Sequence, residues 1–320
     1  MSNREFDKPG VMVLVGPTAV GKTAAAIELA DRCGGEIVSA DSRYLYRGLD
    51  VGTAKPSPAE RARVPHHLID VTDPDRPWSL AEYQQAAYVV IDGILARGHQ
   101  PLLVGGTGQY VRAVTDGWQP PPGADTGALR VTLEAELAAG GVEALAERLR
   151  RVDPASAAVV DLRNPRRVVR ALEVALSTGQ SFVAQRQKTP PLFRSAWMGL
   201  WLPRQELYSR IDARVDAMLA AGLVAEVEGL VARGYAWDLP AMSAVGYRQI
   251  GGYLRGEYGL DEAARQIKRA TRQLVRRQAN WFKPNDPTIH WVRSGPEAAA
   301  EMEEWLRGHC WGPFADSRRR

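Results

Sequence analysis

Residues 16–23 read Gly16-Pro17-Thr18-Ala19-Val20-Gly21-Lys22-Thr23 and follow the phosphate-loop (P-loop) pattern G-x-x-x-x-G-K-[ST]. The apolar run 11–15 before them is typical of a buried parallel strand, and residues 24–32 after them are mostly helix formers. In such a unit the loop N–H groups and the positive helix end converge on phosphate oxygens. Lys22 adds a positive charge, and the Thr23 hydroxyl can ligate Mg²⁺. We therefore predict that residues 16–23 bind a diphosphate or triphosphate together with Mg²⁺.

Two further loops follow predicted strands. Asp41 comes after the short strand 36–38, and Gly105-Gly106-Thr107-Gly108 comes after the strand 102–104. Because the carboxyl ends of parallel strands meet at one edge of a sheet, Asp41 should lie beside the P-loop. There its carboxylate can take a proton from an acceptor group or hydrogen-bond it, which indicates a second substrate. The alternative for Asp41 is a structural capping role.

The glycine loop argues against nucleotide hydrolysis. A nucleoside triphosphatase usually has an acidic residue at the end of such a strand, where this chain has Gly105 and Gly106. Glycines leave room for a substrate to pass close to the backbone, and Thr107 offers one hydroxyl. The alternative is an ordinary tight strand-to-helix turn.

Further motifs occur in a fixed order along residues 11–293. Besides the P-loop they are Ala40-Asp41-Ser42, the segment 46–56, His66-His67-Leu68-Ile69-Asp70, the glycine loop, Arg167-Val168-Val169-Arg170-Ala171-Leu172-Glu173, Gly246-Tyr247, Thr271-Arg272, Arg277-Gln278 and Trp281-Phe282. In these motifs the chain closely resembles bacterial tRNA dimethylallyltransferases, the adenosine-37 isopentenyl transferase family. The resemblance implies transfer of a dimethylallyl group from dimethylallyl diphosphate to N6 of adenosine 37 in the anticodon loop, with release of diphosphate.

The resemblance also implies roles for particular residues. An adenine amino group is a poor nucleophile, so a base that removes its proton lowers the barrier, and Asp41 suits this role. The P-loop amides, Lys22, Thr23 and Mg²⁺ would stabilise the charge that gathers on the leaving diphosphate. Arg214 occupies a position that the family pattern marks as basic and is assigned to the diphosphate; a solvent-facing helix arginine is the alternative. The expected catalytic residues are thus Asp41, Thr23 and Arg214.

At a few positions the chain departs from the residues that are usual in the family it resembles. Arg43-Tyr44 replace Met-Gln, Arg166 replaces Gln and Asn280 replaces Thr. The family's glutamine is expected to touch the target base, and the Tyr44 ring could stack on a base instead. We assign Asp41, Ser42, Arg43, Tyr44 and Thr107 to tRNA contacts near this base.

The charge distribution fits an acidic partner. The chain has 320 residues with a net charge of +4 and a pI near 9.1. No acidic residue occurs from 263 to 285, where basic residues recur at helical spacing, and a second basic cluster lies at 163–170. The residues assigned to tRNA phosphates are Arg166, Arg167, Arg170, Arg269, Arg272, Arg276 and Arg277. Solvated helix faces are the alternative for both clusters.

The periodicity predicts an α/β fold, a P-loop-type doubly wound parallel sheet with an inserted all-helical subdomain. Strands and helices alternate to about residue 116, helical patterns follow from 126 to 188, and the sheet resumes at 196–202. Helices are expected at 205–233 and 261–282, with a last strand at 289–292. The expected domains are a core formed by residues 1–117 and 195–320, and an insertion formed by residues 118–194 that contacts tRNA.

The remaining features bear on location and on rival functions. Cys33 and Cys310 are isolated, residues 1–10 lack an apolar export core, and no stretch is apolar enough to span a membrane. We therefore expect a cytoplasmic protein without membrane contact, and we expect it to be a monomer. One rival is a small-molecule kinase using ATP, whose P-loop and following aspartate would look alike. The other is a non-catalytic RNA-binding protein that retains a phosphate site.

Overall fold

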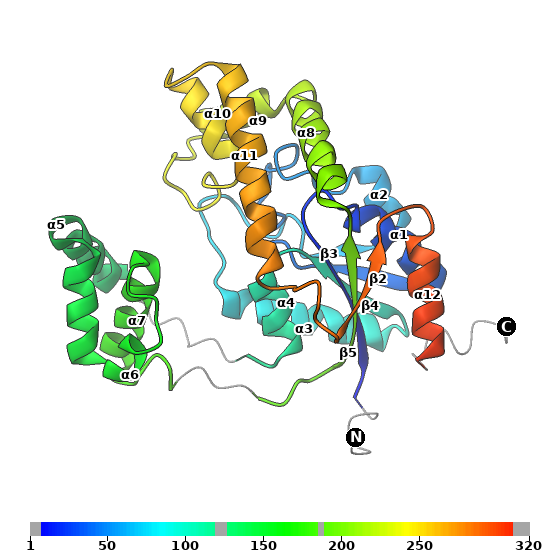
Figure 1. Cartoon of the computed structure of the whole chain (residues 1–320), viewed down its shortest axis with the longest axis horizontal. Coiled ribbons are helices and arrows are strands. Elements are labelled where there is room, and N and C mark those ends of the chain that lie inside the picture. Colours follow the sequence, from blue (N-terminus) through cyan, green and yellow to red (C-terminus); the bar gives the residue numbers. More distant parts are fainter. Residues whose placement is uncertain (1–7, 119–126, 185–188, 310–320) are drawn as a thin grey trace. The chain divides into compact units, whose positions relative to one another are not determined.

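The computed structural model describes residues 8–118, 127–184 and 189–309. Six parallel strands form one sheet in the order β3-β2-β4-β1-β5-β6 (Figure 1). The strands are β1 (Gly10–Val15), β2 (Gly35–Ser39), β3 (His66–His67), β4 (Gln100–Gly105), β5 (Arg194–Trp201) and β6 (Ile289–Arg293). The predicted doubly wound parallel sheet is confirmed.

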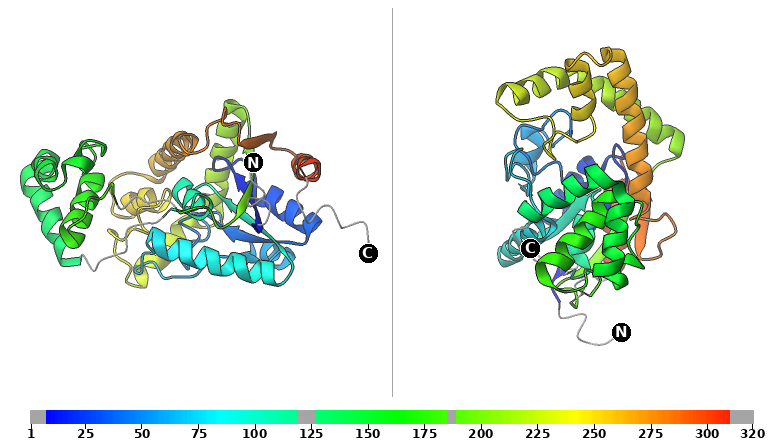
Figure 2. Two further views of the ribbon diagram at one scale, coloured as in Figure 1. Left: turned by 90° about the horizontal axis from the view of Figure 1, so that it is seen from below. Right: turned by 90° about the vertical axis from the view of Figure 1, so that its left-hand side faces the viewer.

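Apolar residues cover both faces of this sheet. Met12 and Leu14 of β1 share a core with helices α1 (Lys22–Cys33) and α12 (Ala298–Gly308). Successive strand residues point to opposite faces, so the fully buried Val13 faces the other side. Helix α3 (Leu80–Ala96), the long cyan helix in Figure 2, carries the buried Tyr83, and α4 (Gly108–Thr115) carries the buried Tyr110. The two rings stack with their centroids 3.8 Å apart. The Tyr83 hydroxyl donates to Ser39 O of β2 at 2.9 Å, which attaches α3 to the sheet.

Four helices stand over the carboxyl ends of the strands (Figure 1). They are α8 (Arg204–Ala220), α9 (Leu223–Ala232), α10 (Tyr247–Leu254) and α11 (Leu260–Ala279). The prediction of one helix over 205–233 is wrong, because α8 ends at Ala220 and Gly222, with a φ of 96°, is the N-cap residue of α9. A left-handed glycine between two helices changes their direction at little steric cost. Their buried residues form a second core with Tyr46 and Leu49, so these helices hold the segment that follows Asp41.

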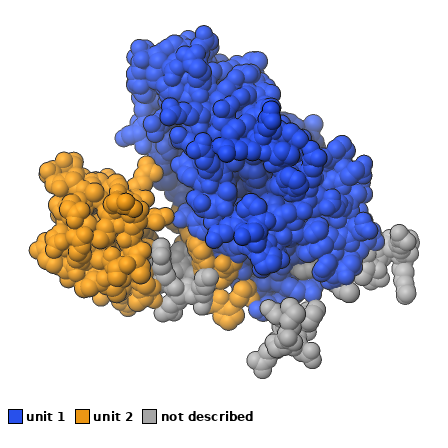
Figure 3. Space-filling view, in the orientation of Figure 1, with its two compact units in different colours: residues 1–78, 83–115, 192–320 blue, residues 79–82, 116–191 orange. Residues whose placement is uncertain are grey.

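The chain divides into two compact units (Figure 3). Unit 1 comprises residues 1–78, 83–115 and 192–320, and unit 2 comprises residues 79–82 and 116–191. Unit 2 contains α5 (Gly127–Val152), α6 (Pro154–Ala157) and α7 (Pro165–Thr178), with its own apolar core. The region 126–188, expected to be helical throughout, is helical wherever the structure describes it apart from short connections.

Two smaller features complete the fold. The short helix α2 (Pro58–Arg63) begins at Ser57, whose side chain and that of Glu60 form a capping box. None of the described helices combines the length and apolar character needed to cross a lipid bilayer. Cys33 is a half-buried thiol, and Cys310 lies outside the described residues.

Candidate active site

The P-loop connects β1 to α1. Gly21 adopts a φ of 99° directly before the helix, a conformation that favours glycine, and the helix begins at Lys22. The Lys22 ammonium donates to Gly16 O at 3.0 Å and Pro17 O at 2.8 Å. Burial lowers the pKa of Lys22 to about 8. Repulsion by Arg214 also lowers this pKa, whereas attraction by Asp41 raises it. The loop thus holds a cation on its own carbonyls, which phosphate oxygens could replace.

Three residues from distant elements hold this loop. The Thr18 N–H donates to Gln278 Oε1 of α11 at 2.9 Å. Val20 O accepts hydrogen bonds from the Ser294 hydroxyl and from Arg210 Nη1 of α8. These residues were not predicted from the sequence to have a role, although Gln278 is part of a family motif and Arg210 lies one helical turn before Arg214.

Asp41 and Thr107 extend from the neighbouring strands. Asp41 Oδ1 accepts the Arg43 N–H at 2.9 Å, so the structural capping alternative accounts for one carboxylate oxygen. The second oxygen has no hydrogen bond within the described residues. Asp41 also lies close enough to Lys22 to affect its pKa. The Ser42 N–H donates to Thr107 Oγ1 at 3.2 Å, which joins the loops after β2 and β4.

Arg214 reaches this region from α8. Its Nη2 donates to Thr53 O at 3.2 Å, and its charge acts on both Lys22 and Tyr44. The structure therefore brings together four of the predicted features: the P-loop, Asp41, Thr107 and Arg214. Their individual roles in the reaction stay predictions.

Tyr44 and Arg43 form hydrogen bonds to backbone carbonyls of the protein. The Tyr44 hydroxyl donates to Ala54 O at 2.9 Å and lies within reach of the Thr23 and Arg214 side chains. Burial, aided by the nearby Asp41, raises the pKa of Tyr44 to about 12. Arg43 Nη1 donates to Pro240 O at 2.6 Å. Both side chains thus bond the protein itself, and the Tyr44 hydroxyl lies beside two residues assigned to the diphosphate, Thr23 and Arg214. Contact of Arg43 and Tyr44 with tRNA stays a prediction.

The glycine loop is filled by protein. A Cβ atom on Gly106 would lie 2.2 Å from Gln278 Nε2, and one on Gly108 would lie 2.1 Å from the Trp281 ring. The expectation that these glycines leave an open path for a substrate is therefore wrong for this structure. Their lack of side chains instead lets the carboxyl-terminal end of α11 pack onto the turn.

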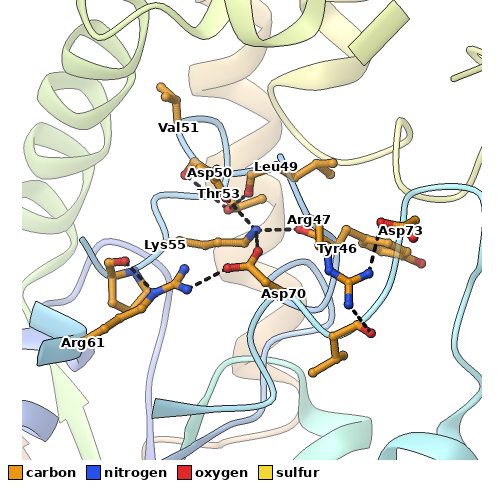
Figure 4. A network of polar contacts seen from close by, with 12 residues as sticks. Tyr46, Arg47, Leu49, Asp50, Val51, Thr53, Lys55, Arg61, Asp70 and Asp73 are labelled. Carbon is orange, nitrogen blue, oxygen red and sulfur yellow. Dashed lines mark hydrogen bonds and ion pairs between the residues drawn. The ribbon is translucent and has the colours of Figure 1, made fainter. Parts of the chain in front are cut away.

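An ion cluster around the buried Lys55 side chain stabilises the segment after Asp41 (Figure 4). The Lys55 ammonium, on a side chain that is only 2 % exposed, donates to Tyr46 O at 2.5 Å, Asp50 Oδ1 at 2.7 Å and Asp70 Oδ1 at 2.5 Å. Arg61 donates to the other oxygen of Asp70 at 2.7 Å. Burial alone would raise the pKa of Asp70, but hydrogen bonds from Lys55 and Arg61 lower it below its ordinary value. The family motifs around Lys55 and Asp70 thus have a structural function.

The helices above the sheet hold the same segment. Glu226 of α9 accepts the backbone N–H groups of Asp50, Val51 and Gly52 at 2.8, 2.7 and 3.0 Å. The Tyr247 hydroxyl, at the start of α10, donates to the same carboxylate. These contacts hold the backbone of residues 50–52 in place. The next two residues then accept hydrogen bonds, Thr53 O from Arg214 and Ala54 O from Tyr44.

A mainly apolar pocket of about 400 Å³ lies on the β5 side of the P-loop. Gly16 and Pro17 line it together with Trp201, Phe282 and Trp291. Asp41, Lys22 and Arg214 do not line it, so this pocket is separate from the predicted catalytic residues.

The basic stripe on α11 is only partly free. Arg269, Arg276 and Arg277 are exposed, and Arg276 also lies within reach of the Tyr208 hydroxyl of α8. Arg272 Nη2 instead donates to both carboxylate oxygens of Asp212 of α8, at 2.7 and 2.6 Å, and the guanidinium lies over the Tyr208 ring. Arg272 is thereby committed to helix packing, and tRNA contact by the other three arginines stays a prediction.

The second basic cluster lies in unit 2. Arg166 and Arg167, in the first turn of α7, are exposed. Arg170 Nη1 lies 3.4 Å from the fully buried carboxylate of Glu173, which also accepts from Arg130. Arg170 therefore neutralises a buried charge within its own unit.

Thr23 is the predicted protein ligand of Mg²⁺. Thr23 is in the first turn of α1, next to the P-loop. Within the described residues, no group of three or more His, Cys, Asp or Glu side chains could hold a metal ion. Mg²⁺ commonly takes few protein ligands and completes its shell with substrate phosphates and water, so a lone threonine hydroxyl fits such an ion.

Comparison with known proteins identifies the family of this chain. The model of the IPP transferase family matches residues 44–285, and that of the isopentenyl transferase family matches residues 9–70. The chain belongs to the IPP transferase family. A tRNA dimethylallyltransferase of Roseiflexus sp. is 51 % identical to it over 300 residues, which cover 92 % of this chain and 98 % of the relative. One from Herpetosiphon aurantiacus is 48 % identical over 299 residues, covering 93 % and 95 %.

Solved structures of this family agree with the fold. The full-length tRNA isopentenylpyrophosphate transferase from Bacillus halodurans matches with a TM-score of 0.69 and 37 % identity, over 98 % of this chain and 99 % of that one. A eukaryotic dimethylallyltransferase acting on tRNA matches with a TM-score of 0.76 over 94 % of this chain and 79 % of the other. At 24 % identity the second likeness concerns the fold alone.

Proposed function

We propose that this member of the IPP transferase family transfers a dimethylallyl group from dimethylallyl diphosphate to N6 of adenosine 37 in the tRNA anticodon loop. The observation that carries the proposal is the convergence of a carboxylate, Asp41, with the P-loop cation Lys22 and with Arg214 at one edge of the sheet. The relatives named tRNA dimethylallyltransferase support this class of enzyme and not the small-molecule kinase.

The diphosphate binds at residues 16–23. Its oxygens accept from the loop N–H groups, and Lys22 exchanges its bonds to the Gly16 and Pro17 carbonyls for bonds to phosphate. Arg214 approaches the same region from α8. Mg²⁺ at Thr23 would supply further positive charge to the diphosphate. These groups bind the leaving diphosphate more strongly as its charge grows, which lowers the barrier.

Asp41 acts on the acceptor. The N6 lone pair attacks C1 of the allyl group, the C1–O bond breaks, and its electron pair leaves with the diphosphate. The N6 proton passes to the Asp41 carboxylate oxygen that does not cap Arg43. A stacked base cannot reach a carboxylate at the end of a buried strand, so adenine 37 is extruded from the anticodon loop.

The exposed arginines of the two basic clusters contact the tRNA backbone. Arg269, Arg276 and Arg277 of α11 and Arg166 and Arg167 of α7 bind phosphates. The helical insertion thereby takes part in tRNA binding. The enzyme works as a monomer in the cytoplasm, a compartment in which an isolated thiol such as Cys33 stays reduced.

Product analysis tests this proposal. The chain is incubated with unmodified tRNA and dimethylallyl diphosphate labelled in the allyl group, and the tRNA is digested to nucleosides. The expected product is labelled N6-dimethylallyladenosine from position 37. Failure to consume the diphosphate under any condition would favour a non-catalytic RNA-binding protein, and turnover of ATP without RNA would favour a kinase.

A further inference from the structure

One side chain of α11 joins two loops of the active site. Gln278, in the last turn of the helix, is 9 % exposed. Its Oε1 accepts from the Thr18 N–H of the P-loop at 2.9 Å, and its Nε2 donates to Gly106 O of the glycine loop at 3.2 Å. Gly106 has no room for a Cβ because Gln278 lies against it. The amide thus satisfies one backbone group on each of two adjacent strand ends.

The opposite face of α11 carries the exposed arginines. Arg269 and Arg276 lie about 180 to 200° around the helix from Gln278, as 100° per residue dictates. Lys268 and Arg272 bind Asp216 and Asp212 of α8, so this helix is fixed along one side as well. One helix therefore has a solvent face suited to phosphates and a buried face bonded to the P-loop.

We propose that Gln278 is a positioning residue that couples RNA binding on α11 to diphosphate binding on the P-loop. The coupling rests on the proposed function, because it requires RNA on the arginine face and an allylic diphosphate on residues 16–23. RNA phosphates on Arg269 and Arg276 hold α11 in the position in which Gln278 bonds Thr18 and Gly106. The P-loop is then already ordered when the diphosphate arrives, so less ordering entropy is lost on binding.

The test measures dimethylallyl diphosphate affinity with and without RNA. The RNA is an anticodon stem-loop in which purine replaces the target adenine, so that the reacting amino group is missing. Calorimetry on the full chain should show binding that is about fivefold tighter or more when the stem-loop is saturating, since allosteric couplings are typically of that size. By linkage the diphosphate must tighten stem-loop binding by the same factor.

Two substitutions separate coupling from stability. Gln278→Met keeps the side-chain volume and removes both hydrogen bonds, whereas Gln278→Glu retains an acceptor for Thr18 but cannot donate to Gly106 when ionised. We expect both to reduce the affinity ratio to within about twofold of one. Gln273→Met, on the exposed side of the same helix, should keep the wild-type ratio. A loss of melting temperature without a change in the ratio would mean that Gln278 is only structural, and would overturn the proposal.

Hydrogen exchange on the wild-type chain gives a result that does not depend on the variants folding. Stem-loop alone should slow exchange in peptides that contain residues 16–23, and unchanged exchange there would contradict the coupling. A chain that binds both ligands independently overturns the coupling and leaves the proposed function intact. A chain that binds no dimethylallyl diphosphate overturns both.

Discussion

At the residue scale, the protonation of Lys22 should limit diphosphate binding. Burial is the main reason that its pKa falls to about 8. The charged form binds phosphate, so affinity for dimethylallyl diphosphate should be constant below pH 8 and fall by up to about tenfold per pH unit above it. Calorimetric dissociation constants between pH 7 and about 9.5 measure this effect.

The control for Lys22 is an arginine, which does not titrate in this range. Lys22→Arg should give a flat profile even if its affinity is lower. Above pH 8, Lys22 of the wild-type protein should take up a proton from the buffer when the diphosphate binds. The measured binding heat should then depend on the ionisation heat of the buffer. Wild-type affinity that stays constant to pH 9.5 would show that Lys22 remains charged or does not contact the ligand.

Tyr44 should act on the diphosphate rather than on the base. Its hydroxyl bonds Ala54 O and lies near Thr23 and Arg214. Tyr44→Phe should weaken dimethylallyl diphosphate binding about three- to tenfold, the usual effect of one hydrogen bond, and change tRNA affinity by less than about twofold. Tyr46→Phe is the control. Weaker tRNA binding with unchanged diphosphate affinity would restore the base-contact hypothesis.

These residues show what a sequence can predict about a site. The P-loop and Asp41 could be placed because a strand, a loop and a helix adjacent in sequence fix where their residues lie. The directions of Arg43 and Tyr44 could not, because they depend on Pro240 O and Ala54 O, which only the folded chain brings near. Gln278 belonged to a motif, but its partners Thr18 and Gly106 lie far away in the sequence.

At the element scale, α11 should provide phosphate contacts through its exposed arginines. Each lost phosphate contact lowers the slope of log affinity against log salt by somewhat less than one unit. Arg269→Gln with Arg276→Gln should therefore make the slope for tRNA shallower by nearly two units and hardly affect dimethylallyl diphosphate binding. Filter binding across a salt series measures both slopes.

Arg272→Gln is the matched control on the same helix. It removes the ion pair with Asp212 and should lower the melting temperature with little change in the salt slope. An unchanged slope in a correctly folded Arg269 and Arg276 double variant would mean that this helix face is only solvated, and that tRNA binds elsewhere.

Element boundaries also show the limits of periodicity. The apolar pattern runs through 205–233, and the break at Gly222 depends on one left-handed residue that the pattern does not register. The glycine loop after β4 could be predicted as a turn from its sequence. The packing of Gln278 and Trp281 against this loop could not be predicted, because these residues lie at the end of α11 and in the turn after it, more than one hundred and seventy positions later.

At the scale of the whole molecule, stability at low pH should depend on Glu36. Its carboxylate is 4 % exposed and bonds Arg97, His67 and His99. Burial alone would raise the pKa of Glu36, but these hydrogen bonds lower it to about 2 from an ordinary 4.5. A depressed folded-state pKa stabilises the fold above pH 4.5, and this contribution, on the order of 3 kcal/mol, is lost as pH falls from 4.5 to 2.

Denaturant unfolding of wild type and Glu36→Gln measures this contribution. The two should differ most in free energy of unfolding at pH 5 to 7, and the difference should shrink steadily between pH 4.5 and 2. Because the other carboxylates titrate in both proteins, Glu36 is assessed from the difference between the two free energies of unfolding. A difference that is independent of pH would mean that the variant acts through packing instead of charge.

The parallel sheet and the helical insertion could be predicted because their hydrophobic periods differ along the chain. The two compact units each have a separate core, as the change of pattern between residues 116 and 126 suggested. Which basic residues are free could not be predicted, since Arg170 and Arg272 match their neighbours in sequence but bind Glu173 and Asp212.

Single-turnover kinetics of Asp41→Asn test the central claim most directly. With saturating tRNA and dimethylallyl diphosphate, rapid-quench measurements report the chemical step alone. Loss of a positioned general base should lower this rate by roughly two to four orders of magnitude, with both substrate affinities within about threefold of wild type. Asp73→Asn, which removes an exposed partner of Arg47, should leave the rate unchanged. An Asp41→Asn rate close to that of wild type would contradict the assignment of Asp41 as the base that receives the adenine proton.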